Sequence, residues 1–401
     1  MRKPKVRPCG WSCARWSRLS VIRFGTKAVP SARKSRCASS DLPVPLKMNL
    51  VILLAVVVIG QLCAGCQTLG YYCQAAQGQC EMLTGHRDVP EILQDPAEPE
   101  SLKQRLRLAM ELRTFAETNL GLPAGGSYRT YKKLDRPNSV WVVTASKEFS
   151  TELESWWYPV VGRFTARSYF DKARAEHYAQ TLRSEGLEVH LGGARAYSTL
   201  GWFRDPLLST FIHEPDTELA ELLFHELAHR RLFIANDAAF NESMATAVGQ
   251  AGVRRWLTAQ HNATALAAYH QTTGQRQQFF KLLEITRDEL RRLYATDLRA
   301  PDMRLQKQAL HSRMHDRYLE LKAQWNGYSG YDSWFAKPPS NPRMAAMATY
   351  YKYVPAFDKL LLQCGDDLDQ FFAEAAALGK LPAADRRAQL ERLMKDGPSR
   401  P

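Results

Sequence analysis

The sequence predicts an α+β fold, in which a mixed segment of strands and helices precedes a mostly helical C-terminal part. Two observations carry this prediction. Between residues 101 and 191, helical periodicity alternates with short runs rich in β-branched and aromatic residues. Beyond residue 242, apolar residues recur almost throughout at helical spacing. We therefore expect one folded region over 66–401, with an α/β part to about 212, a helical part over 213–380 and a flexible tail.

The first 47 residues are interpreted as lying outside the mature protein. They hold 12 of the 54 basic residues and one of the 41 acidic ones, so the formal net charge of +13 falls to +2 for the remainder. A nearly neutral folded region does not predict nucleic-acid binding, which requires a basic face. We interpret this arginine-rich leader as a start site assigned too early, with translation beginning at Met48 or near Val44. A basic targeting peptide is the alternative.

Residues 48–65 have the pattern of a lipoprotein signal peptide. Their apolar run is shorter than the ~20 residues that span a bilayer, and small residues follow it. The stretch "LCAGC" resembles a lipobox and predicts lipid attachment at Cys66, although Cys63 stands where leucine is usual. Gln67 favours the outer membrane, facing the periplasm. An uncleaved membrane anchor is the alternative, and both interpretations place the remaining chain outside the cytoplasm.

The α/β part is expected to contain two helices and two strands. Ser101 can cap the first helix, and Gly186 follows the second. The predicted bounds are 101–118 and 171–184 for the helices, and 139–145 and 187–191 for the strands. Cys73 and Cys80 could form a disulfide in an oxidising compartment, or remain free thiols like Cys364.

The helical part begins with "LLFHELAHRRLFIANDAAFNES", residues 222–243. Start signals at 215–218 and leucines at helical spacing predict a helix with one side in the core. The turn Ala235-Asn236-Asp237 precedes a second helix that opens near Glu242. Further helices are predicted over 262–296, 302–325 and near 343–376.

His225 and His229 project from one face of the predicted helix, because residues i and i+4 lie about 6 Å apart along its axis. Two imidazoles in this arrangement can share a Zn²⁺ ion, and Glu226 lies where its carboxylate could take a proton from a metal-bound water. A hydrogen-bonded structural pair is the alternative. Two unpartnered imidazoles beside leucine and phenylalanine would be costly, which favours the metal site.

The third ligand decides the type of site. Leu232 and Ala235 stand where metzincins have glycine and histidine, which excludes that class. Glu242 is the best candidate, because an antiparallel return of the second helix would bring it over the histidines. Asp237 and His261 are weaker candidates. The alternative for Glu242 is a carboxylate that only stabilises the helix start.

Five stretches carry a resemblance to a known family. They are "WWYPVVG", "AYSTLGWFRDPLLSTF", "FHELAH", "FNESMATAV" and "ATYYKYVPAF". Over about 66–376 the chain resembles the predicted bacterial aminopeptidase family, whose members are lipoprotein zinc peptidases of the gluzincin type. The resemblance implies a zincin-like fold, a zinc cofactor and a peptide substrate. It also implies that His225, His229 and Glu242 bind zinc and that Glu226 is the general base.

Other candidate site residues come from chemistry that a peptidase needs. An oxyanion requires a hydrogen-bond donor, for which Tyr350 is the first candidate. Zincins bind extended peptide on an edge strand before the active helix, so 193–201 is expected to contact substrate. The other candidates for the oxyanion are Tyr351, Tyr353 and Tyr197. The candidates for substrate contact are Tyr197, Ser198, Thr199 and Gly201. The candidates for binding a free amine of the substrate are Glu214, Asp205 and Asp237. Packed aromatics and ordinary loop residues are the alternatives.

Two classes of function remain at this point. The first is a lipid-anchored zinc peptidase, either an aminopeptidase or an endopeptidase. The second is a non-catalytic envelope lipoprotein that uses the fold as a binding scaffold. Glu226 favours the first, because a scaffold has no need of a general base between two ligands.

Overall fold

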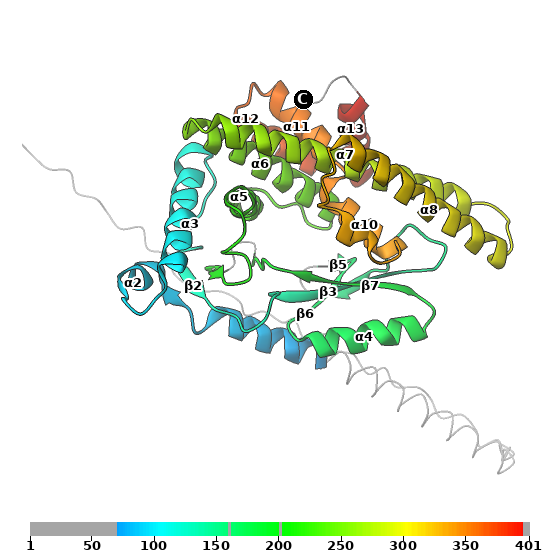
Figure 1. Ribbon diagram of the computed structural model, residues 1–401, viewed down its shortest axis with the longest axis horizontal. Helices are drawn as coiled ribbons and strands as arrows, with labels where there is room; N and C mark the ends of the chain where they lie inside the picture. The colour runs from blue at the N-terminus through cyan, green and yellow to red at the C-terminus, as the bar shows by residue number, and fades with distance from the viewer. Residues whose placement is uncertain (1–69, 159–161, 200–202, 396–401) are drawn as a thin grey trace, which may run out of the picture. The chain divides into compact units, whose positions relative to one another are not determined.

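The computed structural model describes residues 70–158, 162–199 and 203–395 (Figure 1). The chain divides into two units, Met1–Cys63 and Ala64–Pro401, and the described residues belong to the second. The predicted leader, the signal peptide, Cys66 and Gly201 lie outside the described residues. Among the described helices, none combines the length and apolar character needed to cross a membrane.

A three-stranded antiparallel sheet lies at the centre of the α/β part (Figure 1). Its strands are β3 (Val140–Ser146), β6 (Arg167–Tyr169) and β7 (Glu188–Ala194), in the order β6-β3-β7. The register of β3 and β7 runs from Val140 opposite Ala194 to Ser146 opposite Glu188. Helix α4 (Lys172–Ser184) packs on this sheet, and α10 (Asn341–Tyr351) lies on the opposite face (Figure 1). The predicted strands and the predicted helix over 171–184 are confirmed.

The remaining described strands form two smaller sheets. One contains β1 (Arg87–Asp88), β2 (Thr130–Lys132) and β8 (Leu207–Leu208), with β2 and β8 parallel. The other is the pair of β4 (Trp156–Tyr158) and β5 (Gly162–Phe164). Strands of two or three residues carry too little alternation to be predicted from sequence.

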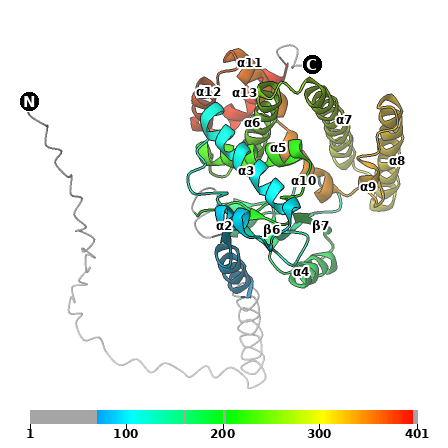
Figure 2. The same cartoon turned by 60° about the vertical axis from the view of Figure 1, so that its left-hand side comes forward.

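Helices surround the sheet and form most of the structure. Helix α3 (Glu100–Asn119) confirms the prediction for 101–118 and packs against α5 (Asp216–Arg231) (Figure 2). Helix α6 (Ala238–Ala259) runs back along α5. An unlabelled helix over 70–83 and α2 (Val89–Gln94) precede α3. Two long helices, α7 (Ala263–Tyr294) and α8 (Ala300–Gln324), form the predicted hairpin, and Pro301 lies in the first turn of α8.

The single helix predicted near 343–376 is wrong. The structure has α10, α11 (Val354–Gln363) and α12 (Leu368–Lys380), after the short α9 (Asp332–Phe335). Pro355 lies in the first turn of α11, where its missing N–H does no harm. Gly365 and Asp366 have left-handed φ angles of 62° and 63°, which end α11.

The flexible tail predicted after residue 380 also needs correction, because α13 (Ala383–Lys395) is a helix. Its Leu390 is fully buried in the largest apolar core, which also contains residues of α5, α6 and α11. Only Arg386 and Leu390 of this helix are buried, and most of its other residues are charged or polar. The sequence therefore lacks the apolar periodicity that predicts a packed helix.

Three apolar cores hold the described residues together. The largest joins α3, α5, α6 and α11 to α13. The second lies within the α7–α8 hairpin and includes residues of α9 and α10. The third lies between the central sheet and α4. Helix α5, which carries both histidines of the motif, therefore belongs to the most extensive core.

The described cysteines are free thiols. Cys73 and Cys80 are exposed on the helix over 70–83 and lie seven residues apart. Seven residues of α-helix span about 10 Å. A disulfide needs Cα atoms within about 7 Å, so the pairing considered above is excluded for this conformation.

Candidate metal centre

Helix α5 presents the two histidines of the motif at the border of the core. Leu219, Leu223 and Leu227 are fully buried on the opposite side of the helix. His229 is 5% exposed, and His225 lies one turn before it. The apolar side fixes the rotation of α5, so both imidazoles project toward α6.

The turn between α5 and α6 is held by side chains at the start of α6. Asn241 is buried, and its amide both accepts from the N–H of Ile234 at 2.8 Å and donates to the carbonyl of Ile234 at 2.7 Å. The Asp237 carboxylate accepts from the N–H of Phe240 and caps α6. Arg386 of α13 donates to the other oxygen of Asp237 at 2.7 Å. These contacts fix the first turn of α6, and Glu242 directly follows it.

Helices α5 and α6 approach each other closely at Gly249. A Cβ atom at this position would lie 2.9 Å from the carbonyl oxygen of Glu221 and 3.5 Å from the Cβ of His225. Only a residue without a side chain fits such an approach. Gly249 thereby lets α6 lie near enough for Glu242 to reach both histidines.

His225, His229 and Glu242 form a compact group, which we call the donor triad. The two Nε2 atoms are 3.1 Å apart, and Oε2 of Glu242 lies 3.2 Å from that of His225 and 3.6 Å from that of His229. In a tetrahedral zinc site with bonds of about 2.0–2.1 Å, donor atoms lie about 3.3–3.4 Å apart. The triangle therefore has the size that a tetrahedral zinc ion requires. The described residues contain no other such group of histidine, cysteine and carboxylate donors.

Electrostatics at the triad favour an ionised carboxylate. Burial alone would raise the pKa of Glu242, but its interactions with His225 and His229 hold that pKa well below the ordinary value. Burial alone would lower the pKa of His225, but the hydrogen bond and charge of Glu242 raise it. A half-buried anion facing two ring nitrogens suits a divalent cation.

The outer nitrogens of the two rings differ. The Nδ1 atom of His225 lies 3.4 Å from the hydroxyl of Thr246, which lies one turn after Glu242 on α6. The Nδ1 atom of His229 is buried and has no hydrogen-bond partner among the described residues. Outer contacts of this kind orient metal-binding imidazoles. Sequence reasoning missed Thr246, although its spacing from Glu242 was a usable signal.

Glu226 and Tyr350 flank the donor triad. Glu226 is partly buried and makes no hydrogen bond with another described residue. Tyr350 of α10 is 48% exposed, and its ring centroid lies 6.5 Å from that of His225. The negative charge of Glu242, then desolvation and Glu226, raise the pKa of Tyr350, so its hydroxyl remains a donor. On the other side, the exposed ring of Phe233 lies 6.5 Å from His229.

The other candidate tyrosines have different partners. The hydroxyl of Tyr351 accepts a hydrogen bond from Arg276. Tyr353 is buried. The hydroxyl of Tyr197 donates to Gln79, and burial raises the pKa of Tyr197 to about 12.

The segment predicted to contact substrate is mainly a loop. Strand β7 ends at Ala194, so only the first two residues of 193–201 belong to a strand. Ser198 and Thr199 donate to Asp205, whose carboxylate also accepts from the N–H of Thr199. Burial raises the pKa of Asp205 despite these bonds. Strand β7 lies at the edge of its sheet. Binding of an extended peptide beside β7 itself therefore stays a prediction.

The weaker candidates for the third metal ligand and for binding a substrate amine lie outside the donor triad. Glu214 forms an ion pair with Arg195. Asp205 and Asp237 hold the loop and the α6 cap described above. His261 follows the C-terminal end of α6, about 25 Å of helix away from Glu242. None of these residues belongs to the donor triad.

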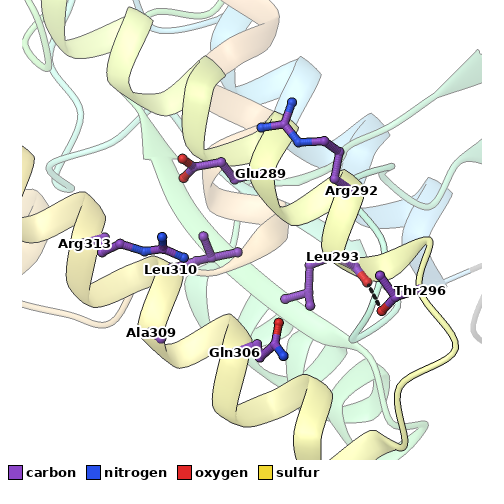
Figure 3. A pocket seen from close by; sticks show the side chains of 8 residues that line it. All are labelled: Glu289, Arg292, Leu293, Thr296, Gln306, Ala309, Leu310 and Arg313. Carbon is purple, nitrogen blue, oxygen red and sulfur yellow. Dashed lines mark hydrogen bonds between the residues drawn. The ribbon is translucent and has the colours of Figure 1, made fainter.

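A surface hollow lies elsewhere, between α7 and α8 (Figure 3). Its volume is about 440 Å³, and Leu293 and Leu310 are buried beneath it. The residues that line it are Glu289, Arg292, Leu293, Thr296, Gln306, Ala309, Leu310 and Arg313. It shares no residue with the donor triad.

The fold and the site define a mixed α/β protein with two histidines and one glutamate gathered by two antiparallel helices. The model of a family described as "Putative aminopeptidase" matches residues 70–390, and the chain belongs to this family. No curated protein and no solved structure matches the chain. Family membership indicates a peptidase function in general.

Proposed function

We propose that the protein is a zinc-dependent peptidase that acts as an aminopeptidase. The observation that carries this proposal is the triangle of three donor atoms, 3.1 to 3.6 Å on each side, with Glu226 beside it. His225, His229 and Glu242 would hold the ion and leave its fourth position open. Bound zinc would supply Lewis acidity, lowering the pKa of a water molecule and polarising the scissile carbonyl.

The residues around the triad have separate roles in this proposal. Glu226 accepts a proton from the attacking water and passes it to the leaving amine. Tyr350 donates a hydrogen bond to the oxygen that becomes negative in the transition state. Peptide would bind in extended form along β7, whose outer edge is unpaired among the described strands.

The first test measures bound metal and peptide cleavage in the purified protein. We expect about one zinc per chain and cleavage of aminoacyl substrates. Glu226→Gln removes the base but keeps the shape of the side chain. It should retain zinc and lose activity by about 10²–10⁴-fold. Cleavage that survives this substitution would reject the mechanism, and cleavage of blocked peptides would favour an endopeptidase.

A non-catalytic scaffold is the second candidate function. It is favoured because the carboxylates of Glu214, Asp205 and Asp237 already bind other side chains of the protein. None of them is therefore free to hold the amine of a substrate. A protein that binds zinc but cleaves neither free nor blocked peptides would support the scaffold over the peptidase.

We also propose attachment to the outer membrane, facing the periplasm, through lipid on Cys66. The apolar segment and the lipobox-like "LCAGC" support it. Cys66→Ala should move the protein from the membrane fraction to the soluble fraction. Retention of this variant in the membrane would favour an uncleaved anchor.

A further inference from the structure

A buried ion pair joins α5 to α7 one turn before the donor triad. Glu221 precedes His225 by four residues, and its side chain is 13% exposed. One of its carboxylate oxygens accepts from Arg276 of α7 at 2.5 Å, and the other accepts from the hydroxyl of Tyr269 at 2.7 Å. Removing either partner of such a pair would leave a buried charge uncompensated.

Arg276 also reaches the end of α10. The same Nη1 atom donates to the hydroxyl of Tyr351 at 3.1 Å. The ring of Tyr351 stacks on Phe280, with centroids 3.6 Å apart and planes 14° from parallel. Phe280 lies one turn after Arg276 on α7. Helix α7 therefore holds Tyr351 by both its hydroxyl and its ring.

A second contact fastens the chain just after α10. The N–H of Tyr353 donates to the hydroxyl of Ser243 at 3.1 Å. Ser243 directly follows Glu242 on α6. The end of α10 is thus held by α7 on one side and by α6 on the other.

Tyr350 lies next to Tyr351 but has no such anchor. Its side chain is 48% exposed, and its hydroxyl makes no hydrogen bond with another described residue. Its position beside His225 is therefore set by its neighbours in the chain. We propose that Arg276 and Tyr351 are positioning residues, which hold the end of α10 so that Tyr350 faces the donor triad. This inference rests on the proposed peptidase function.

Tyr351→Phe is the sharpest variant for the test, because it removes one hydroxyl and keeps both the ring stack and the Glu221–Arg276 pair. We expect kcat to fall about tenfold, since small displacements of a reacting group are costly, with KM and zinc content unchanged. Tyr269→Phe is the matched control. It removes a hydrogen bond to the same carboxylate without touching α10, and kcat should stay within about twofold of wild type.

A double-mutant cycle separates positioning from general stabilisation. Tyr350→Phe removes the group that Tyr351 is inferred to position. In that background, Tyr351→Phe should have no further effect on kcat, because contacting residues that act through one group are not additive. An equal tenfold loss in both backgrounds would overturn the inference, as would an unchanged kcat for Tyr351→Phe alone.

Measurements on wild-type protein distinguish failure of the proposed function from failure of the positioning role. Wild-type protein without zinc or cleavage would reject the proposed function, and the inference would fall with it. Wild-type protein that cleaves peptide, combined with additive variants, would reject the positioning role alone. Thermal melting of each variant reports whether a loss of kcat comes from unfolding.

Discussion

Asn241 is the residue that most directly sets the place of Glu242 in the chain. Asn241 directly precedes Glu242, and its side-chain amide hydrogen-bonds both the N–H and the carbonyl of Ile234 across the turn. A buried side chain that makes two hydrogen bonds to the backbone of one residue holds geometry more tightly than either bond alone. The position of Glu242 therefore depends on a neighbour that does not itself belong to the triad.

Asn241→Ala should weaken zinc binding without removing a ligand. Loss of the amide leaves the N–H and carbonyl of Ile234 without these partners, and the turn is free to move. We expect zinc affinity to fall about 10–100-fold, as for other groups that orient ligands. Competition with a chelator measures this affinity. Ser243→Ala, on the same turn of α6, is the control, and equal zinc affinity in wild type and Asn241→Ala would contradict the role.

The sequence was sufficient to predict the residues of the triad but not the contacts that assemble it. His225, Glu226 and His229 follow from helical spacing, and Glu242 follows from an expected antiparallel return. Thr246 was within reach of the same argument. The Arg276–Glu221 pair was not, because α5 and α7 are 55 residues apart at this contact and no local pattern links them.

At the scale of elements, the close approach of α5 and α6 is the feature that allows two helices to share one site. Gly249 has an ordinary helical conformation, so its role is space rather than backbone freedom. Alanine would gain about 1 kcal/mol of helix propensity. Its Cβ would meet a backbone carbonyl at 2.9 Å, which cannot move aside as a side chain can.

Gly249→Ala should therefore be destabilising overall. Overpacking costs about 1–3 kcal/mol, which exceeds or cancels the gain in propensity. The larger effect should be on zinc, since the two helices would separate where the ligands face each other. Gly274→Ala on α7, where nothing lies within 4 Å of the added atom, is the control and should be neutral or stabilising. Tighter zinc binding by Gly249→Ala would refute this account.

The elements themselves were predicted with uneven success. Long amphipathic segments such as α3, α7 and α8 were found within a few residues of their ends. The stretch 343–376 was wrongly joined into one helix, because its apolar spacing continues through two breaks. Pro355 marks the first break. The left-handed pair Gly365 and Asp366 marks the second break, where the sequence has no proline to indicate it.

At the scale of the whole molecule, two half-buried histidines outside the donor triad link stability to pH. Burial, helped by Arg343 and Lys337, lowers the pKa of His190 on β7 to about 4. Burial, helped by Lys307, does the same for His311 on α8. Their pKa in an unfolded chain is about 6.5. Below that pH the unfolded state binds more protons than the folded state does.

Stability should therefore fall as the pH falls from about 6.5 toward 4. Each histidine contributes up to about 3 kcal/mol to this loss. His190→Gln removes one titrating group, so its thermal midpoint should change less between pH 7 and pH 4.5 than that of wild type. Melting curves across this range provide the measurement. Parallel pH profiles for wild type and variant would contradict the prediction.

The fold class was predictable, while the packing of distant parts was not. Periodicity indicated a mixed segment of strands and helices before a mostly helical part, and the structure has this order. The tail after residue 380 was misread, because α13 contributes few buried side chains to a mostly charged sequence. Its docking depends on contacts with α11 and α12, and on the bond from Arg386 to Asp237 at the start of α6, which lies 149 residues earlier in the chain.

The contact between Arg386 and Asp237 has a consequence for biosynthesis. Arg386 emerges from the ribosome about 150 residues after the first turn of α6, which its guanidinium helps to hold. Premature termination before this codon would yield a polypeptide that contains the whole donor triad but lacks this support for the cap of α6. If the triad binds zinc as proposed, its assembly would wait until Arg386 has been made, and removal of α13 by proteolysis would weaken metal binding from a distance.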